Sequence, residues 1–302
     1  MTTAFVLSGG GSLGAVQVGM LQALADRGVE PDLLVGTSAG ALNAAYVAGH
    51  GMSRVSLKEL EGIWRGLRRK DVFPISPLRA AAVLAHSAPA LCSNGALRRL
   101  ISDHVEYAEL GAASLPVHLV ATDACSGQEV LLSHGPAVEA VLASAAIPAV
   151  FPSVPIEGRH LVDGGVANNA AVSQAVALGA DRIYVLPSGY ACALDRPPHT
   201  ALASAMHALT LLIEQRLILE VAAFAESIDV RVLPPLCPLA VSSMDFDHAG
   251  ELIGRASRST LEWLDSGGTT RVHPERFLSL HSHRPLLEGS AKTGRSPAVK
   301  PD

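Results

Sequence analysis

The sequence is poor in charged residues, aromatic residues and cysteine. Charged residues make up 17% of its 302 residues and aromatic residues 4%, whereas soluble domains average about 25% charged. Lys and Arg number 23 against 28 Asp and Glu, a net charge of −5, so no basic excess points to a nucleic-acid partner. The four cysteines lie far apart without a CxxC pair, which argues against a zinc site and a secreted disulfide framework. We therefore expect a protein of a reduced compartment, without metal or cofactor.

Long uninterrupted apolar runs are also scarce, although apolar residues reach 49%. Residues 1–25 carry no charged side chain and 33–53 carry only His50 as a titratable group, but glycines and small polar residues interrupt both segments. Glycine-rich backbone facing lipid would leave polar groups without partners, and Met1-Thr2-Thr3 lacks the basic residues of a signal peptide. The sequence predicts a cytoplasmic, soluble chain with strands buried on both faces, at most peripheral to a membrane.

Strand and helix patterns alternate along the first 48 residues. Residues 4–7 and 33–35 are short apolar strands, and 15–26 and 41–48 have the composition and spacing of helices. Such alternation predicts an α/β fold with a parallel sheet. Further strands are expected at 117–121, 129–132, 160–162, 182–186 and 229–233, and further helices at 137–146, 170–178, 200–226 and 247–264.

Two boundaries follow from composition. Asn168 or Asn169 precedes the expected helix at 170–178 and is a candidate for its N-cap. From residue 266 onward Gly, Ser, His and Pro accumulate and periodicity disappears. We expect one folded domain over residues 1–265 and a partly disordered tail over 266–302.

A glycine-rich loop follows the first strand and precedes the first helix, with the sequence Gly9-Gly10-Gly11-Ser12-Leu13-Gly14. Backbone N–H groups at a helix N-terminus bind anions, either a phosphate or a developing oxyanion. The loop also fits the dinucleotide pattern GxGxxG, with Glu30 or Asp32 at the distance expected for a ribose contact. By itself, the loop leaves both functions open.

Two more glycine motifs end predicted strands. The second strand runs into Gly36-Thr37-Ser38-Ala39-Gly40, a GxSxG pattern whose glycines permit the sharp turn that exposes a nucleophilic serine. A later strand ends in Asp163-Gly164-Gly165, which alone is most often a turn. Together, the three motifs provide a nucleophile, a base and oxyanion donors at strand ends, where ligands bind in open α/β sheets.

With these motifs in place, the chain resembles patatin-like phospholipases of the bacterial type over roughly residues 4–265. The resemblance rests on blocks in this order: Leu7-Ser8-Gly9-Gly10-Gly11 through Gly19, 36–43, Val120-Ala121-Thr122-Asp123, Ala143-Ser144-Ala145-Ala146-Ile147-Pro148 with Phe151-Pro152, and Asp163-Gly164-Gly165 with Asn168-Asn169. It implies a three-layer α/β/α fold with a mostly parallel central sheet. It also implies cleavage of lipid acyl esters through an acyl-enzyme by a Ser–Asp dyad without histidine.

The resemblance assigns roles to particular residues. Ser38 would be the nucleophile, Asp163 the general base, and the N–H groups of Gly9, Gly10, Gly11, Ser12 and Gly14 the oxyanion hole, with Gly36, Gly40, Gly164 and Gly165 supporting the turns. A carboxylate with a pKa of about 4 is a weak base for a serine hydroxyl. Because desolvation raises the pKa of a carboxyl group, we expect Asp163 to be poorly exposed.

One residue departs from the family pattern. The family usually has Arg or Lys where this chain has Leu13, which makes a neutral lipid ester or a small acyl ester more plausible than a phospholipid. The apolar stretch 72–91 is a candidate lid or lipid contact, with core packing as its alternative. Cations at Arg65, Arg68, Arg69 and Lys70 fit a helix C-terminus better than an anionic-lipid contact.

Two other functional classes stay open. A Ser-His-Asp α/β-hydrolase would recruit a histidine such as His207 or His248, although Ser38 follows the second strand, earlier than is usual for that fold. A catalytically silent lipid-binding protein would keep the fold without the chemistry. The sequence predicts neither the acyl substrate nor the oligomeric state.

Overall fold

The computed structural model describes residues 1–74, 76–85, 87–189, 197, 201–237, 239 and 241–267. The tail expected at 266–302 lies outside the described residues apart from Ser266 and Gly267. Within the described part of the chain, eight strands form one mixed sheet with helices on both sides. The strands are β1 (Thr3–Leu7), β2 (Leu33–Thr37), β3 (Val117–Asp123), β4 (Glu129–Leu132), β5 (Val154–Ile156), β6 (Arg159–Asp163), β7 (Arg182–Leu186) and β8 (Asp229–Val232).

The sheet has a parallel part and an antiparallel part. Its order is β5-β6-β3-β2-β1-β7-β8, with β4 paired to β3 outside this path. Strands β3, β2, β1, β7 and β8 run parallel, whereas β4, β5 and β6 join by antiparallel pairs. The expected α/β fold with a mostly parallel central sheet is confirmed for these five strands.

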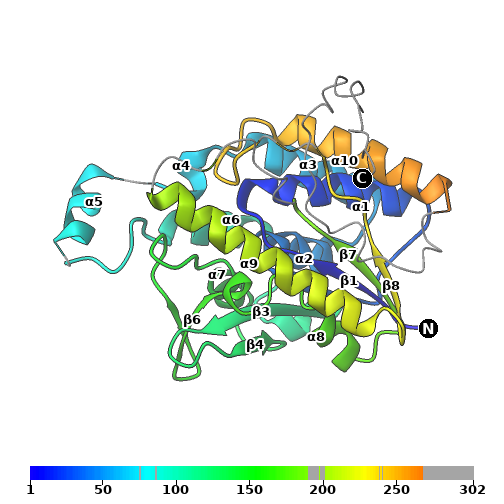
Figure 1. Cartoon of the computed structure of the whole chain (residues 1–302), viewed down its shortest axis with the longest axis horizontal. Coiled ribbons are helices and arrows are strands. Elements are labelled where there is room, and N and C mark those ends of the chain that lie inside the picture. The colour runs from blue at the N-terminus through cyan, green and yellow to red at the C-terminus, as the bar shows by residue number, and fades with distance from the viewer. Residues whose placement is uncertain are drawn as a thin grey trace, which may run out of the picture.

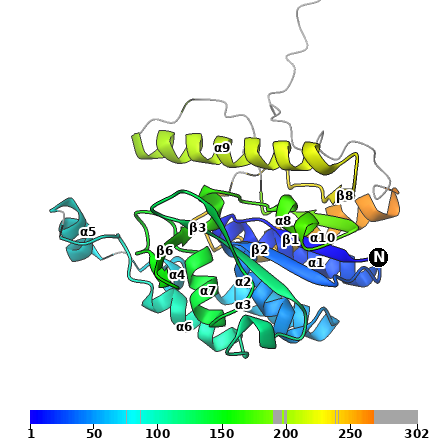
Figure 2. The ribbon, with the colours of Figure 1, turned by 90° about the horizontal axis from the view of Figure 1, so that it is seen from below.

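Alternating side chains of the strands build two apolar layers. Phe5 and Leu7 face one core, and Ala4 and Val6 face the other. One side is covered by α1 (Gly14–Asp26), α2 (Ala39–His50), α3 (Arg54–Gly66), α6 (Gly95–His104), α7 (Ala137–Ser144) and α10 (Ala249–Asp265). The other is covered by α8 (Val172–Ala177) and α9 (Ala201–Phe224), and Figure 2 shows the layers edge-on. The three-layer α/β/α prediction is confirmed.

The expected asparagine cap on α8 is wrong. The helix begins at Val172 after Ala171, without a side-chain cap. The Asn168 amide instead donates to Glu129 and Glu220, and the Asn169 amide bonds the backbone of Gly9. Both side chains are therefore committed to partners far away in the sequence.

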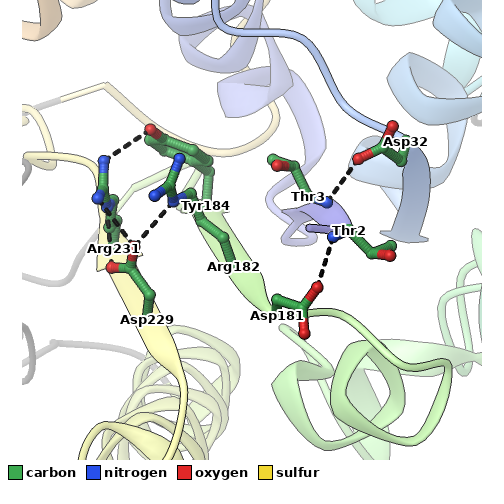
Figure 3. A network of polar contacts seen from close by, with 8 residues as sticks. All are labelled: Thr2, Thr3, Asp32, Asp181, Arg182, Tyr184, Asp229 and Arg231. Carbon is green, nitrogen blue, oxygen red and sulfur yellow. Dashed lines mark hydrogen bonds and ion pairs between the residues drawn. The ribbon is translucent and has the colours of Figure 1, made fainter.

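A polar network holds the amino ends of the parallel strands (Figure 3). The Thr2 N–H donates to Asp181 and the Thr3 N–H to Asp32, each at 2.7 Å. Beside them, Asp229 accepts hydrogen bonds from Arg182 and Arg231, and Arg231 also donates to the Tyr184 hydroxyl. The first two glycine motifs follow the opposite, carboxyl ends of β1 and β2, so this network lies at the end of the sheet away from those motifs.

Candidate active site

Sheet register brings Ser38 and Asp163 together. β4 pairs with residues 119–122 along one edge of β3, while β2 pairs with 117–120 and β6 with 121–123 along the other. β2 and the antiparallel β6 therefore meet end to end on the same edge of β3. Ser38 follows the last residue of β2, and Asp163 is the last residue of β6, so both lie at this junction.

Ser38 occupies a strained turn between β2 and α2. Its φ of 54° and ψ of −118° are unusual for a residue with a side chain. A Cβ on Gly40 would lie 2.2 Å from the Leu7 carbonyl oxygen, and one on Gly36 would lie 2.7 Å from the Ala41 Cα. Glycine is therefore required on both sides of the serine for the helix to start this close to the sheet.

Ser144 stabilises this turn from α7. The Ser38 N–H donates to the Ser144 hydroxyl at 3.0 Å, and that hydroxyl donates to the Val120 carbonyl at 2.6 Å. Ser144 is fully buried, so it satisfies two backbone groups that have no access to water. Ser144 belongs to the block at residues 143–148, whose sequence alone does not indicate this contact.

The Ser38 hydroxyl donates to Asp163 Oδ2 at 2.6 Å. Both residues are 7% exposed, as expected for Asp163. Burial raises the pKa of Asp163 to about 6, although hydrogen bonds from Ser38 and from the Gly165 N–H oppose this rise. Because burial dominates, Asp163 is a stronger base than an exposed aspartate while it is still ionised at neutral pH.

The glycine-rich loop lies beside this pair, but its N–H groups differ in availability. The Gly9 N–H bonds to Asn169, the Ser12 N–H to the Ser243 carbonyl, and the Gly14 N–H to carbonyls of its own turn. Gly10 and Gly11 donate no hydrogen bond to any described residue. Both line the cavity that Ser38 and Asp163 also line, so they are the donors available to a ligand.

Asn169 lies in the segment that follows Asp163, and it joins this segment to the glycine-rich loop. Its Oδ1 accepts from the Gly9 N–H at 3.0 Å, and its Nδ2 donates to the Gly9 carbonyl at 3.3 Å. The Gly9 N–H is also 3.3 Å from the Asn169 carbonyl oxygen. These contacts hold Gly9 in place beside the nucleophile. A Cβ on Gly9 would lie 3.0 Å from the Ser38 Cβ.

The cavity at this site has a volume of about 350 Å³ and mostly apolar walls. Its described lining includes Leu13, which packs near Gly189. Among the described lining residues, Asp163 is the only one with an ionisable side chain. The remaining apolar wall comes from several segments: Phe73, Ile147, Pro148, Val150, Val166, Leu217, Leu239, Val241 and Met244.

The alternative site residues lie elsewhere. His248 directly precedes α10, and its Nδ1 lies 3.1 Å from Asp245 Oδ2. No described histidine lines the cavity. The side chain of His207 lies outside the described residues. Asp32 bonds Thr3 at the start of β1, the opposite end of that strand from the glycine loop, which argues against a ribose contact.

Within the described residues, no cluster of three or more His, Cys, Asp or Glu side chains is arranged to hold a metal ion. No helix in the same part of the chain is long and apolar enough to cross a membrane.

Comparison with known proteins identifies the family. The model of the patatin-like phospholipase family matches residues 5–176, more than half of the chain. The chain belongs to the patatin-like phospholipase family. The match begins within β1 and ends within α8, and it contains the glycine loop, Ser38, Asp163 and Asn169.

Relatives of this patatin-like chain include much longer proteins. Patatin-like phospholipase domain-containing protein 7 of Mus musculus is 28% identical over 192 residues, which is 62% of this chain and 13% of the mouse protein. The uncharacterized NTE family protein Mb1092c of Mycobacterium bovis is 27% identical over 179 residues, 59% of this chain and 46% of that protein. The crystal structure of VipD from Legionella pneumophila aligns at a TM-score of 0.49 and 15% identity, covering 88% of this chain and 67% of VipD.

Proposed function

We propose that this protein hydrolyses acyl esters of lipids through a covalent acyl-enzyme on Ser38. The observation that carries the proposal is the 2.6 Å hydrogen bond from the Ser38 hydroxyl to a buried carboxylate, Asp163. Membership of the patatin-like phospholipase family supports a lipid substrate. Phospholipase A, lysophospholipase and esterase activities all fit this chemistry.

In the first half of the reaction, Asp163 accepts the Ser38 proton while Ser38 Oγ attacks the ester carbonyl. The tetrahedral intermediate then collapses, the C–O bond to the alcohol breaks, and Asp163 returns the proton to the leaving alkoxide. In the second half, Asp163 takes a proton from water as the water oxygen attacks the acyl-Ser38 carbonyl. The bond between the carbonyl carbon and Ser38 Oγ then breaks, Asp163 returns the proton to Ser38 Oγ, and the fatty acid leaves. Another acyl acceptor could replace water in this step.

Gly10 and Gly11 are the proposed oxyanion donors. Their N–H groups are the members of the expected set that donate to no described residue, whereas those of Gly9, Ser12 and Gly14 are engaged. Of the five N–H donors expected for the oxyanion hole, at Gly9, Gly10, Gly11, Ser12 and Gly14, we therefore retain two. Asn169 would act as a positioning residue, because its side chain bonds both the N–H and the carbonyl of Gly9, the residue before Gly10.

The apolar cavity suggests the kind of ester. The cavity wall contains Leu13 and no described cation. It therefore favours a substrate with an acyl chain and an uncharged group next to the ester bond, such as a neutral lipid ester or a small acyl ester. A lipid of this kind resides in a bilayer or micelle, so contact with a membrane surface is part of the proposal.

The test is an ester panel with two active-site variants. Wild-type protein is incubated with dissolved short-chain esters, monoacylglycerol, lysophospholipid and diacyl phospholipid, and released fatty acid is measured. We expect turnover with at least one substrate, and its loss in Ser38→Ala and Asp163→Asn. Folded wild-type protein that cleaves no member would favour the lipid-binding alternative, and loss of activity in His248→Ala would favour a Ser-His-Asp mechanism.

A further inference from the structure

The chain leaves the cavity wall after Phe73 and returns beside it at Leu91 and Cys92. Phe73 lines the cavity and stacks on Phe151, with ring centroids 5.6 Å apart. On the return, the Leu91 N–H donates to the Ala149 carbonyl at 2.9 Å and the Cys92 N–H to the Val150 carbonyl at 2.8 Å. Val150 is itself a wall residue. Both ends of the excursion are therefore anchored at the cavity.

The excursion carries the short helix α5 (Pro77–Leu84) away from the rest of the molecule, as Figures 1 and 2 show from two directions. Ser76 caps it by accepting from the Arg79 N–H. Leu78, in its first turn, is 85% exposed, the highest value among the exposed large hydrophobic side chains of the described residues. The helix thus holds an apolar side chain in solvent, on a segment whose two ends are anchored at the cavity wall.

Cations flank this exposed leucine. Residues 65–85 contain four Arg and one Lys against one Asp, a local charge of +4 (5 − 1) in a chain of net charge −5. Arg69 and Lys70, in α4 (Arg69–Val72), are exposed and form no ion pair with a described residue. Arg79 on α5 donates to the Ala90 carbonyl. Burial raises the pKa of the Cys92 thiol, and the positive charges of Arg79 and Arg69 oppose this rise.

We propose that Arg68, Arg69, Lys70, Leu78 and Arg79 form a docking surface, the α4–α5 surface, for bilayers that contain anionic lipid. Leu78 would enter the boundary between headgroups and acyl chains while the cations contact anionic headgroups. The inference rests on the proposed function and extends it, because the segment that carries α5 begins after the wall residue Phe73 and ends where Cys92 bonds the wall residue Val150. Charge complementarity selects this occupant: the surface is locally basic in an acidic chain, which a lipid surface of opposite sign would attract.

The experiment measures vesicle binding by co-sedimentation in a Ser38→Ala background, so that lipid stays intact. Vesicles consist of phosphatidylcholine alone or of phosphatidylcholine with 30 mol% phosphatidylglycerol. The test variant is Arg69→Gln/Leu78→Ser. The matched control is Arg54→Gln/Val55→Ser, which removes an exposed cation and an exposed apolar side chain at the far end of α3, roughly 18 Å from the end nearer α4.

We expect binding to anionic vesicles, weaker binding to neutral ones, and release by 0.5 M NaCl. The lost cation alone should weaken binding about fivefold, and the test variant should lose at least tenfold in total, while the control binds like the Ser38→Ala parent. Equal binding to both vesicle types, no binding to anionic vesicles, or equal losses in test and control would overturn the proposal. Sedimentation of the protein without vesicles would instead indicate self-association through α5.

An activity arm separates this proposal from the proposed function. With Ser38 intact, the test variant should cleave a dissolved short-chain ester at the wild-type rate, which also shows that it is folded. Its cleavage of an ester embedded in anionic vesicles should fall at least tenfold. If wild-type protein cleaves no ester, the proposed function fails while the binding result still decides the docking surface.

Discussion

Asp163→Asn should stabilise the protein near neutral pH while it removes activity. In the wild type, burial raises the pKa of Asp163 from 3.8 to about 6 against the opposing hydrogen bonds. Asparagine has nearly the same shape, can accept from the Gly165 N–H and can donate to Ser38 Oγ. The substitution therefore keeps the contacts and removes only the buried negative charge.

The sign of the pH dependence follows from proton binding. Between pH of about 4 and about 6, the native carboxyl group holds a proton that the unfolded chain has already lost, so wild-type stability falls as pH rises through this window and then levels off. A pKa difference of about 2 units corresponds to about 3 kcal/mol. About 2 kcal/mol of this stability is lost as the pH rises from 4.5 to 7.5.

Urea unfolding of both proteins at pH 4.5 and 7.5 measures the effect. Relative to wild type, the variant should gain about 2 kcal/mol in free energy of unfolding between the two pH values. Other titrating groups are common to both proteins and cancel in this difference. A stability difference between the two proteins that stays constant from pH 4.5 to 7.5 would refute the claim that the buried negative charge of Asp163 destabilises the native state.

Three further predictions follow from the same contacts. The rate of ester cleavage should rise with pH, reach half its maximum near pH 6 and level off above about pH 7, and it should be about a tenth of the maximum at pH 5, as a pH–rate profile measures, because protonated Asp163 cannot accept the Ser38 proton. Gly10→Ala would place a Cβ 2.0 Å from Ser188 Oγ, so steady-state turnover should fall about a hundredfold or more, whereas the control Gly62→Ala has open space and should retain turnover. Ser144→Ala leaves the Ser38 N–H and the Val120 carbonyl without their partner and should cost about 1–3 kcal/mol in urea unfolding.

Much of the fold follows from local sequence signals. The strand expected at 182–186 matches β7, and 4–7 and 33–35 lie within β1 and β2, because strands buried on both faces are continuous apolar runs. The second glycine motif places Ser38 at the carboxyl end of a parallel strand, where such a sheet gathers its functional groups. Asp163 ends the antiparallel strand β6, so its meeting with Ser38 depends on the strand pairing rather than on this rule. By contrast, β5 spans three residues and contains Pro155, too short a segment to stand out.

The site's supporting contacts did not follow from the sequence, because they join distant segments. Asn169 bonds Gly9 across 160 positions, and Ser144 bonds Ser38 across 106. Local capping rules predicted a helix cap for the asparagines, whereas the tertiary contact with Gly9 engages the Asn169 side chain. The same contact uses the Gly9 N–H, so the glycine pattern alone could not distinguish free oxyanion donors from structural ones.

The central claim is that Ser38 is an activated nucleophile. The most direct test is the intact mass of wild-type protein and of Ser38→Ala after incubation with a fluorophosphonate. One adduct on the wild type and none on the variant is the predicted result. An adduct on both proteins, or none on folded wild-type protein with or without lipid vesicles, would contradict the account.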